Sequence, residues 1–232
     1  MVQKLKQKVM DGKEITKEEA MTLAEADLDE LCQAADEIRK HFCGNVFDIC
    51  SCINVKGGKC SEDCKFCPQS CFNDKVEVKP HTLIGSDQML EEAAYMAQKG
   101  VVRCDLVSSG RRLPKDDVRK IVQDIEKIRK KTGIAVCCSF GLLDQEDCEM
   151  LRKAGITRLH NNLESSRTFF TGVCSSHSTD DKMATLRAAR AAGLTLCSGC
   201  LINLGESMED RIELALMDRE LGVKSIPVNV LN

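Results

Sequence analysis

The chain has 232 residues, of which 43% are hydrophobic and 30% charged, as is usual for a folded globular protein of one large domain or two small ones. Its net charge of −3 shows no basic excess and argues against nucleic acid as a partner. No apolar run reaches membrane-spanning length and no signal peptide is evident, so we expect a cytoplasmic protein with no membrane contact.

The N-terminal part of the chain predicts helices. Thr16 and Glu19 have the spacing of a capping box, and the stretch that follows, up to His41, is rich in Ala, Leu and Glu. After residue 45 the pattern changes. We therefore expect a helical extension over residues 1–45 and a core domain over residues 46–232.

The core domain alternates short β-branched runs with amphipathic helical stretches. The runs predict six strands, at 47–55, 101–107, 134–140, 157–163, 195–201 and 224–231, and helices are expected between them near 86–99, 115–131, 144–154, 180–192 and 207–221. Such alternation predicts an α/β fold with a parallel sheet, here six strands of a TIM-type (β/α) barrel that normally has eight. The chain therefore forms a partial barrel or lacks the C-terminal part of one. A doubly wound sheet is the rival architecture, but no Gly-rich dinucleotide turn follows the first strand.

Fifteen cysteines without a signal peptide indicate metal or redox chemistry rather than disulfides. Cys60, Cys64 and Cys67 follow the first expected strand with the spacing C-x3-C-x2-C. Three thiolates on one short loop fit a 4Fe–4S cluster whose fourth iron has no protein ligand. A structural zinc site with Cys71 as its fourth ligand is the alternative. The loop follows the C-terminal end of an expected barrel strand, which is where barrels carry their chemistry.

The segment CSEDCKFCPQS, over residues 60–70, resembles the radical S-adenosylmethionine superfamily and, within it, the biotin synthase family. Residues 14–45, 158–166, 193–207 and 225–232 resemble that family's N-terminal helices and later strands, in the same order. The resemblance implies a sulfurtransferase that inserts sulfur into dethiobiotin. The reaction would use 5′-deoxyadenosyl radicals from S-adenosylmethionine and sulfide from an auxiliary iron–sulfur cluster. It also implies an eight-stranded barrel, so that the chain is expected to stop two strands early.

Further cysteines lie on the expected strands, namely Cys50, Cys52, Cys104, Cys137, Cys138, Cys197 and Cys200. Because side chains alternate along a strand, some of these thiols face the barrel lumen and others face the helices, where they are packing residues. The resemblance implies that Cys137 and Cys197 hold the auxiliary cluster, and we add Cys50 as its third ligand. A third cysteine of well-studied members falls here on Asp105, whereas Cys104 is one residue early and points to the opposite face. This pattern resembles a branch with a 4Fe–4S rather than a 2Fe–2S auxiliary cluster. Cys43 and Cys174 receive no role.

A polar row is expected on the fourth strand, where His160, Asn162 and Glu164 are two residues apart and share one face. Such a row in a barrel lumen requires a ligand, and a solvent-facing strand end is the alternative. The resemblance implies that Asn162 and Glu164 bind the ribose of S-adenosylmethionine. It assigns further cofactor contacts to Phe66, Ser108 and Ser109, and substrate contacts to His160, Asn162 and Asn229.

The resemblance also implies reduced flavodoxin or ferredoxin as the electron donor and allows a homodimer. Two other functions stay open from the residues. One is a different radical enzyme, such as a hydrogenase-maturation enzyme or methylornithine synthase. The other is a non-catalytic metal-binding protein.

Overall fold

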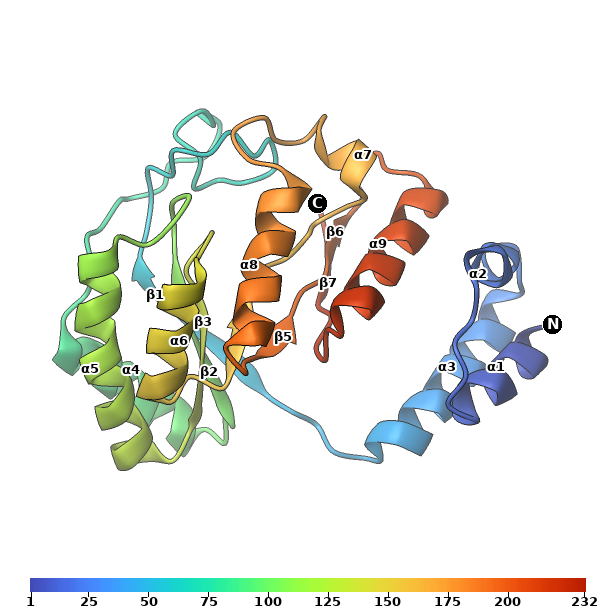
Figure 1. Cartoon of the computed structure of the whole chain (residues 1–232), viewed down its shortest axis with the longest axis horizontal. Coiled ribbons are helices and arrows are strands. Elements are labelled where there is room, and N and C mark those ends of the chain that lie inside the picture. The colour runs from blue at the N-terminus through green and yellow to red at the C-terminus, as the bar shows by residue number, and fades with distance from the viewer.

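The computed structural model of the chain describes residues 1–232 and begins with three helices that stand apart from the sheet in Figure 1. These are α1 (Val2–Met10), α2 (Lys17–Leu23) and α3 (Leu28–Cys43), and the expected capping box of Thr16 and Glu19 starts α2. Buried Val2, Leu5 and Ala34 join α1 to α3. Polar contacts link this group to the core, since Lys17 pairs with Glu209 at 2.6 Å at the start of α9 (Met208–Leu221).

The core contains a parallel sheet in the order β1-β2-β3-β4-β5. The strands are β1 (Cys50–Lys56), β2 (Arg103–Ser108), β3 (Ala135–Ser139), β4 (Arg158–His160) and β5 (Thr195–Cys197). A second parallel pair, β6 (Cys200–Ile202) and β7 (Val228–Val230), continues this sheet through single bridges from Cys197 to Ser225 and from Glu164 to Cys200. The expected partial (β/α) barrel is therefore confirmed.

The expected strand over residues 195–201 is broken into β5 and β6, which corrects the sequence prediction. Gly199 lies at the break, and a side chain there would collide with the carbonyl group of Pro227. The amide of Cys200 donates to that same carbonyl at 3.0 Å. The chain bends here because a residue without a side chain lets the segment before β7 approach closely.

Five helices cover the outer face of the sheet (Figure 1), and all begin and end within two residues of the expected bounds. They are α4 (Ser86–Gln98), α5 (Lys115–Thr132), α6 (Gln145–Ala154), α8 (Thr179–Ala191) and α9. The four-residue helix α7 (Arg167–Phe170) was not predicted. Between helices and sheet lies one hydrophobic core, in which Ile121 and Ile125 of α5 and Leu106 of β2 are fully buried. Each such side chain contributes about 1.5–3 kcal/mol on burial.

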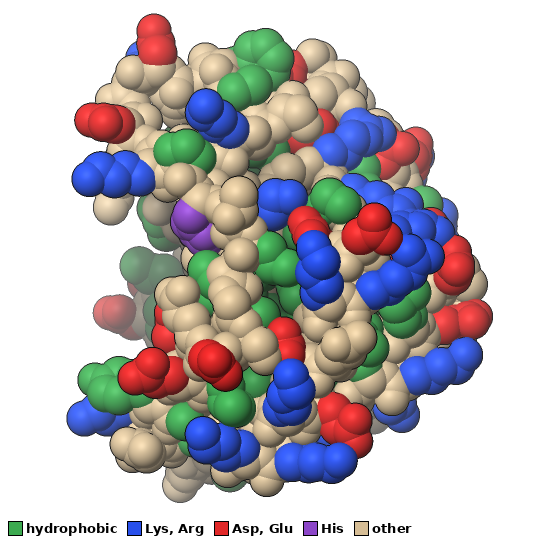
Figure 2. Space-filling view, turned by 90° about the vertical axis from the view of Figure 1, so that its left-hand side faces the viewer, with side chains coloured by type: hydrophobic (Ala, Val, Ile, Leu, Met, Phe, Trp, Pro, Cys, Tyr) green, Lys and Arg blue, Asp and Glu red, His purple; other side chains and the backbone are tan.

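Two further properties concern the surface. None of the helices combines the length and the apolar composition that crossing a membrane requires. Figure 2 shows acidic and basic side chains interspersed over the face that carries α4 and α5.

Candidate functional site

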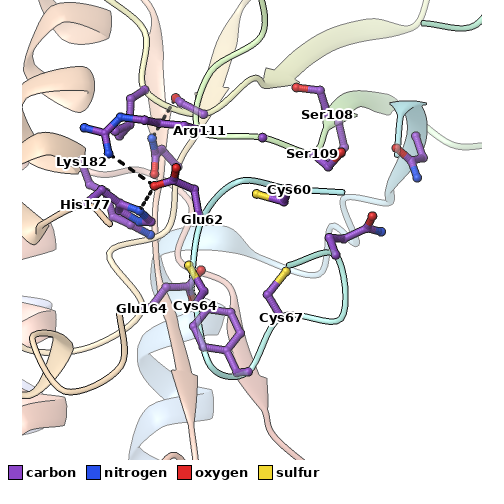
Figure 3. Close-up of a pocket in the computed structure, with 18 of the residues that line it drawn as sticks. Cys60, Glu62, Cys64, Cys67, Ser108, Ser109, Arg111, Glu164, His177 and Lys182 are labelled. Atoms are coloured by element: carbon purple, nitrogen blue, oxygen red, sulfur yellow. Dashed lines mark hydrogen bonds and ion pairs between the residues drawn. The ribbon is translucent and has the colours of Figure 1, made fainter. Parts of the chain in front are cut away.

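The three-cysteine loop begins directly after β1 and lines a cavity of about 540 Å³. Figure 3 shows Cys60, Cys64 and Cys67 on this one loop, and all three line the cavity. The loop is closed by its own backbone, since the Cys60 amide donates to the Gln69 carbonyl at 2.7 Å and the Cys71 amide to the Cys60 carbonyl at 2.8 Å. Three half-buried thiols on a closed loop are a donor set that fits a 4Fe–4S cluster.

The structure gives no support to a zinc site built from this loop and Cys71. The Cys71 side chain is exposed and does not line the cavity. The donor atoms of Cys60, Cys64 and Cys67 also do not form a group within 4.8 Å of one another, as a single ion would require. Their wider spacing suits a cluster of several irons.

Two acidic residues inside the C-x3-C spacing fix the loop to a distant segment, residues 174–178. The Asp63 carboxylate accepts hydrogen bonds from the amides of Ser175 and Ser176, each at 2.9 Å. Together with the Ser175 hydroxyl, which has the largest effect, these bonds hold the pKa of Asp63 well below its usual range. Glu62, buried beside it, accepts from His177 Nδ1 at 2.6 Å and from the Ser176 hydroxyl at 2.9 Å (Figure 3). Sequence analysis missed this clamp because its two halves are more than 100 residues apart.

The other walls of the cavity carry several of the expected cofactor-binding residues. Ser108 and Ser109 stand at the end of β2, and Ser109 donates to the Gly58 carbonyl at 3.0 Å. The Ser108 hydroxyl is buried without a partner. Phe66 lines the cavity and also packs against the small apolar cluster around Phe170, so it is both a loop anchor and a cavity wall. The structure therefore brings the expected residues of three chain segments together.

The prediction that His160, Asn162 and Glu164 form a polar row on one strand is wrong. β4 ends at His160, and the chain then turns, with Glu164 at a φ of 74°. Glu164 lines the cavity, but its neighbour there is Asn161 rather than Asn162. Asn162 instead donates to Glu164 at 3.4 Å and leaves its own Oδ1 buried and unpaired. His160 lies deeper in the lumen, with Nδ1 3.2 Å from the Cys197 sulfur.

Asn229, the other expected substrate contact, lies on β7 as predicted. Its side chain is exposed, with Nδ2 3.5 Å from the Cys200 carbonyl oxygen, and it does not line the cavity. The structure does not bring it together with the cysteine loop.

The second set of thiols is placed by the register of the sheet. Cys52 pairs with Asp105, and Asp105 with Cys137, so these three residues form one row across β1, β2 and β3. Alternation along the strands puts Cys50 and Cys197 on the same lumen face. The opposite face carries Cys104 and Cys138, which are fully buried in the core with Cys148. The predicted facing of Cys104 is therefore confirmed.

Asp105 stands in the middle of the lumen thiols and is 7% exposed. Ser139 donates to one of its carboxylate oxygens at 2.7 Å, and the other oxygen has no partner. Burial raises the pKa of Asp105 to about 6. Burial and then the Asp105 charge raise the pKa of Cys50 to about 12, and the same two causes raise the pKa of Cys52.

Two guanidinium groups oppose the effect of the Asp105 charge in the lumen. Arg103 lies 3.6 Å from the Cys137 sulfur, and Arg158 pairs in register with Cys137 on β4. Burial raises the pKa of Cys137 to about 11, while the hydrogen bond from Arg103 opposes this rise. A lumen that holds thiols and guanidinium groups fits an anionic metal cluster better than an apolar ligand.

The comparisons with known proteins agree with this geometry. The Radical SAM superfamily model matches residues 54–217. A solved structure of a methylornithine synthase shares the fold, with a TM-score of 0.85 and 22% identity, and the match covers 98% of this chain and 68% of that one. A FeFe-hydrogenase maturase from Carboxydothermus hydrogenoformans also shares it, with a TM-score of 0.80 and 17% identity, and that match covers 100% of this chain and 56% of the other. Fold and cysteine loop together define an enzyme of the radical S-adenosylmethionine class.

The curated relatives show which family of this enzyme class the chain resembles. Biotin synthase 2 of Corynebacterium diphtheriae is 51% identical over 99% of this chain and 70% of its own length. Biotin synthase of Brachyspira hyodysenteriae is 47% identical over 98% of this chain and 68% of its own length. The chain belongs to the biotin synthase family of the radical SAM superfamily, and it spans about 70% of the length of these relatives.

Proposed function

We propose that the chain inserts sulfur into dethiobiotin, with an auxiliary iron–sulfur cluster in the barrel lumen as the sulfur source. One observation carries this proposal: the lumen thiols continue directly into the cavity of the three-cysteine loop. Cys52 lines that cavity and stands in one row with Asp105 and Cys137. A radical formed at the loop therefore has a sulfur-rich wall next to it.

At the loop, Cys60, Cys64 and Cys67 would hold a 4Fe–4S cluster, which when bound supplies the electron that splits S-adenosylmethionine into methionine and a 5′-deoxyadenosyl radical. The chain's own groups bind and orient that cofactor. The Glu164 carboxylate is suited to accept hydrogen bonds from two ribose hydroxyls, with Asn162 bonded to it. Lys182, buried at the cavity wall, offers its ammonium group to the carboxylate of S-adenosylmethionine.

In the lumen, Cys50, Cys137 and Cys197 would hold the auxiliary cluster, while Arg103 and Arg158 balance its negative charge. His160 beside Cys197 and the exposed amide of Asn229 are the proposed substrate contacts, since an amide offers a cyclic urea both a donor and an acceptor. Free thiols in this number fit a reducing compartment, so we place the reaction in the cytoplasm. Reduced flavodoxin or ferredoxin is the proposed electron donor, with a homodimer as the proposed assembly.

The test is a reaction with protein whose clusters have been reconstituted with a heavy sulfur isotope. The proposal predicts biotin that carries the heavy isotope, formed from dethiobiotin, S-adenosylmethionine and a reductant, and detected by mass spectrometry. Cleavage of S-adenosylmethionine without biotin would reject the proposal in favour of a different radical reaction. A protein that takes up no iron during anaerobic reconstitution would reject it in favour of a non-catalytic metal-binding protein.

A further inference from the structure

A buried thiol that the sulfur chemistry does not use lies against the cysteine loop. Cys174 follows α7, is 4% exposed, and has its sulfur 3.6 Å from the sulfur of Cys64. The two ring nitrogens of His177 are 3.3 and 3.9 Å from the Cys174 sulfur. Among the histidine, cysteine and acidic side chains, these form the one group of three whose donor atoms all lie within 4.8 Å of one another. The loop clamp therefore also assembles a set of soft donors.

Two distances within this set are close to those around a tetrahedral zinc ion. With Zn–S bonds of about 2.3 Å and Zn–N bonds of about 2.0 Å, two sulfur ligands lie about 3.8 Å apart and a sulfur and a nitrogen about 3.5 Å apart. The observed separations are 3.6 Å between Cys64 and Cys174, and 3.9 Å between Cys174 and His177 Nε2. The third pair, Cys64 and His177, has its donor atoms within 4.8 Å, so the three side chains would close around the ion.

His177 is oriented as a metal ligand would be. Its Nδ1 lies 2.6 Å from a Glu62 oxygen, so that the carboxylate accepts the Nδ1 proton and leaves the Nε2 lone pair free for an ion. Ser176 holds the same Glu62 oxygen at 2.9 Å. A carboxylate behind a histidine is the usual outer support of a zinc site in proteins.

A fourth ligand and a route for the ion are also possible. The Asp63 carboxylate lies 3.1 Å from the Cys174 sulfur, and its oxygens already accept hydrogen bonds from Ser175 and Ser176, so it would hold a water molecule as the fourth ligand rather than bind the ion directly. A second cavity of about 430 Å³ is lined by Cys174 and His177. The site is thus buried, but ions can reach it from outside the main cavity.

We propose that the cluster-free protein binds one thiophilic divalent cation, Zn²⁺ being the type case, through Cys64, Cys174 and His177. Cys64 belongs to both this site and the three-cysteine loop, so the ion and a 4Fe–4S cluster exclude each other. Zinc would then compete with cluster assembly, and Cys174 and His177 would decide how strongly. This inference does not depend on the substrate of the enzyme, and it can fail while the sulfur-insertion proposal stands.

Cluster-free protein with all 232 residues is titrated with Co²⁺ in the absence of oxygen. Zn²⁺ then displaces the bound cobalt in competition with a chromophoric chelator. Wild type is expected to show the visible and thiolate charge-transfer bands of tetrahedral cobalt and one tight equivalent of zinc. Cys174→Ser, which keeps the size of the side chain, should lose both, whereas Cys43→Ser, on the exposed end of α3, should keep them. Glu62→Gln should weaken binding by about 10- to 100-fold.

Thermal melts followed by circular dichroism confirm that each variant is folded before it is titrated. Zinc added before reconstitution should lower the iron bound by wild type by about four per chain, which is the loop cluster, and should leave Cys174→Ser able to assemble that cluster. Folded Cys174→Ser that binds zinc as tightly as wild type would overturn the proposal. The proposal would also be overturned if wild type assembled its loop cluster equally well with and without one equivalent of zinc.

Discussion

The two cysteine regions of this molecule are built in opposite ways. Around the three-cysteine loop the acidic groups are already satisfied, since Asp63 accepts hydrogen bonds from two amides and Glu62 accepts from His177. In the lumen the acidic group is not satisfied, since Asp105 has one unpaired oxygen. Asp218 of α9, outside the sheet, is likewise buried and has both oxygens unpaired.

The pKa values follow this difference. Hydrogen bonds lower the pKa of Asp63, whereas burial raises the pKa of both Asp105 and Asp218 to about 6. The loop region is held in shape by the protein itself. The lumen region holds polar groups at a cost in stability, as is expected where a charged ligand completes the site.

The largest effect is expected from Cys64→Ala, because the loop then keeps only two ligands for its cluster. The variant should hold no loop cluster and should cleave no S-adenosylmethionine, measured as 5′-deoxyadenosine by chromatography. Cys32→Ala, on the exposed face of α3, serves as control and should cleave normally. Retained cleavage in Cys64→Ala would mean that the loop is not the cofactor site.

Cys197→Ala tests the lumen region without changing the loop region. Cys197 faces the lumen and does not line the cavity of the loop. The variant should therefore keep the loop cluster and 5′-deoxyadenosine formation but make no biotin. If it makes biotin at the wild-type rate, the lumen thiols are not the sulfur source.

The same contrast explains what the sequence could and could not predict. Cys60, Cys64 and Cys67 were found because their spacing is local, and the barrel strands because their periodicity is local. The clamp of Asp63 on Ser175 and Ser176 is invisible in the sequence, since hydrogen bonds between segments this far apart leave no periodic pattern.

The two wrong strand predictions also arise because tertiary contacts leave no local pattern in the sequence. The bend at Gly199 depends on the approach of Pro227, and the turn after His160 places Asn161 in the cavity where strand alternation predicted Asn162. The lumen face itself was predictable, because alternation alone separates Cys137 from Cys138.

Gly58→Ala tests how strongly the loop is fixed. Gly58 has a φ of 77°, and an added Cβ would lie 2.6 Å from the Cα of Pro80, so the backbone must move. Gly100→Ala is a matched control, with a φ of 80° and nothing within 4 Å of the added carbon. Both should lose about 1 kcal/mol or more of stability from the unfavourable φ. Gly58→Ala alone should also lose iron from the loop, and equal iron content in the two variants would contradict a rigid loop.

Asp218→Asn lies outside both cysteine regions, and it is expected to raise stability rather than lower it. The pKa of Asp218 is raised from 3.8 to about 6 in the folded protein, so its charge opposes folding above about pH 6, and this opposition disappears as the pH falls below about 4. The substitution should raise the free energy of unfolding at neutral pH by up to about 3 kcal/mol. Urea melts at neutral pH and near pH 4 measure this, and a loss of stability at neutral pH would show that the carboxylate is compensated.

The central claim is that this chain holds two separate clusters, one in the loop and one in the lumen. Its most direct test is the iron and sulfide content per chain after anaerobic reconstitution, with Mössbauer spectra, for wild type and for the variant with Cys50, Cys137 and Cys197 all changed to Ala. The account predicts about eight irons in wild type and about four in the variant, one cubane being lost. About four irons in both proteins, with the same spectrum, would contradict the second cluster and remove the basis for sulfur insertion.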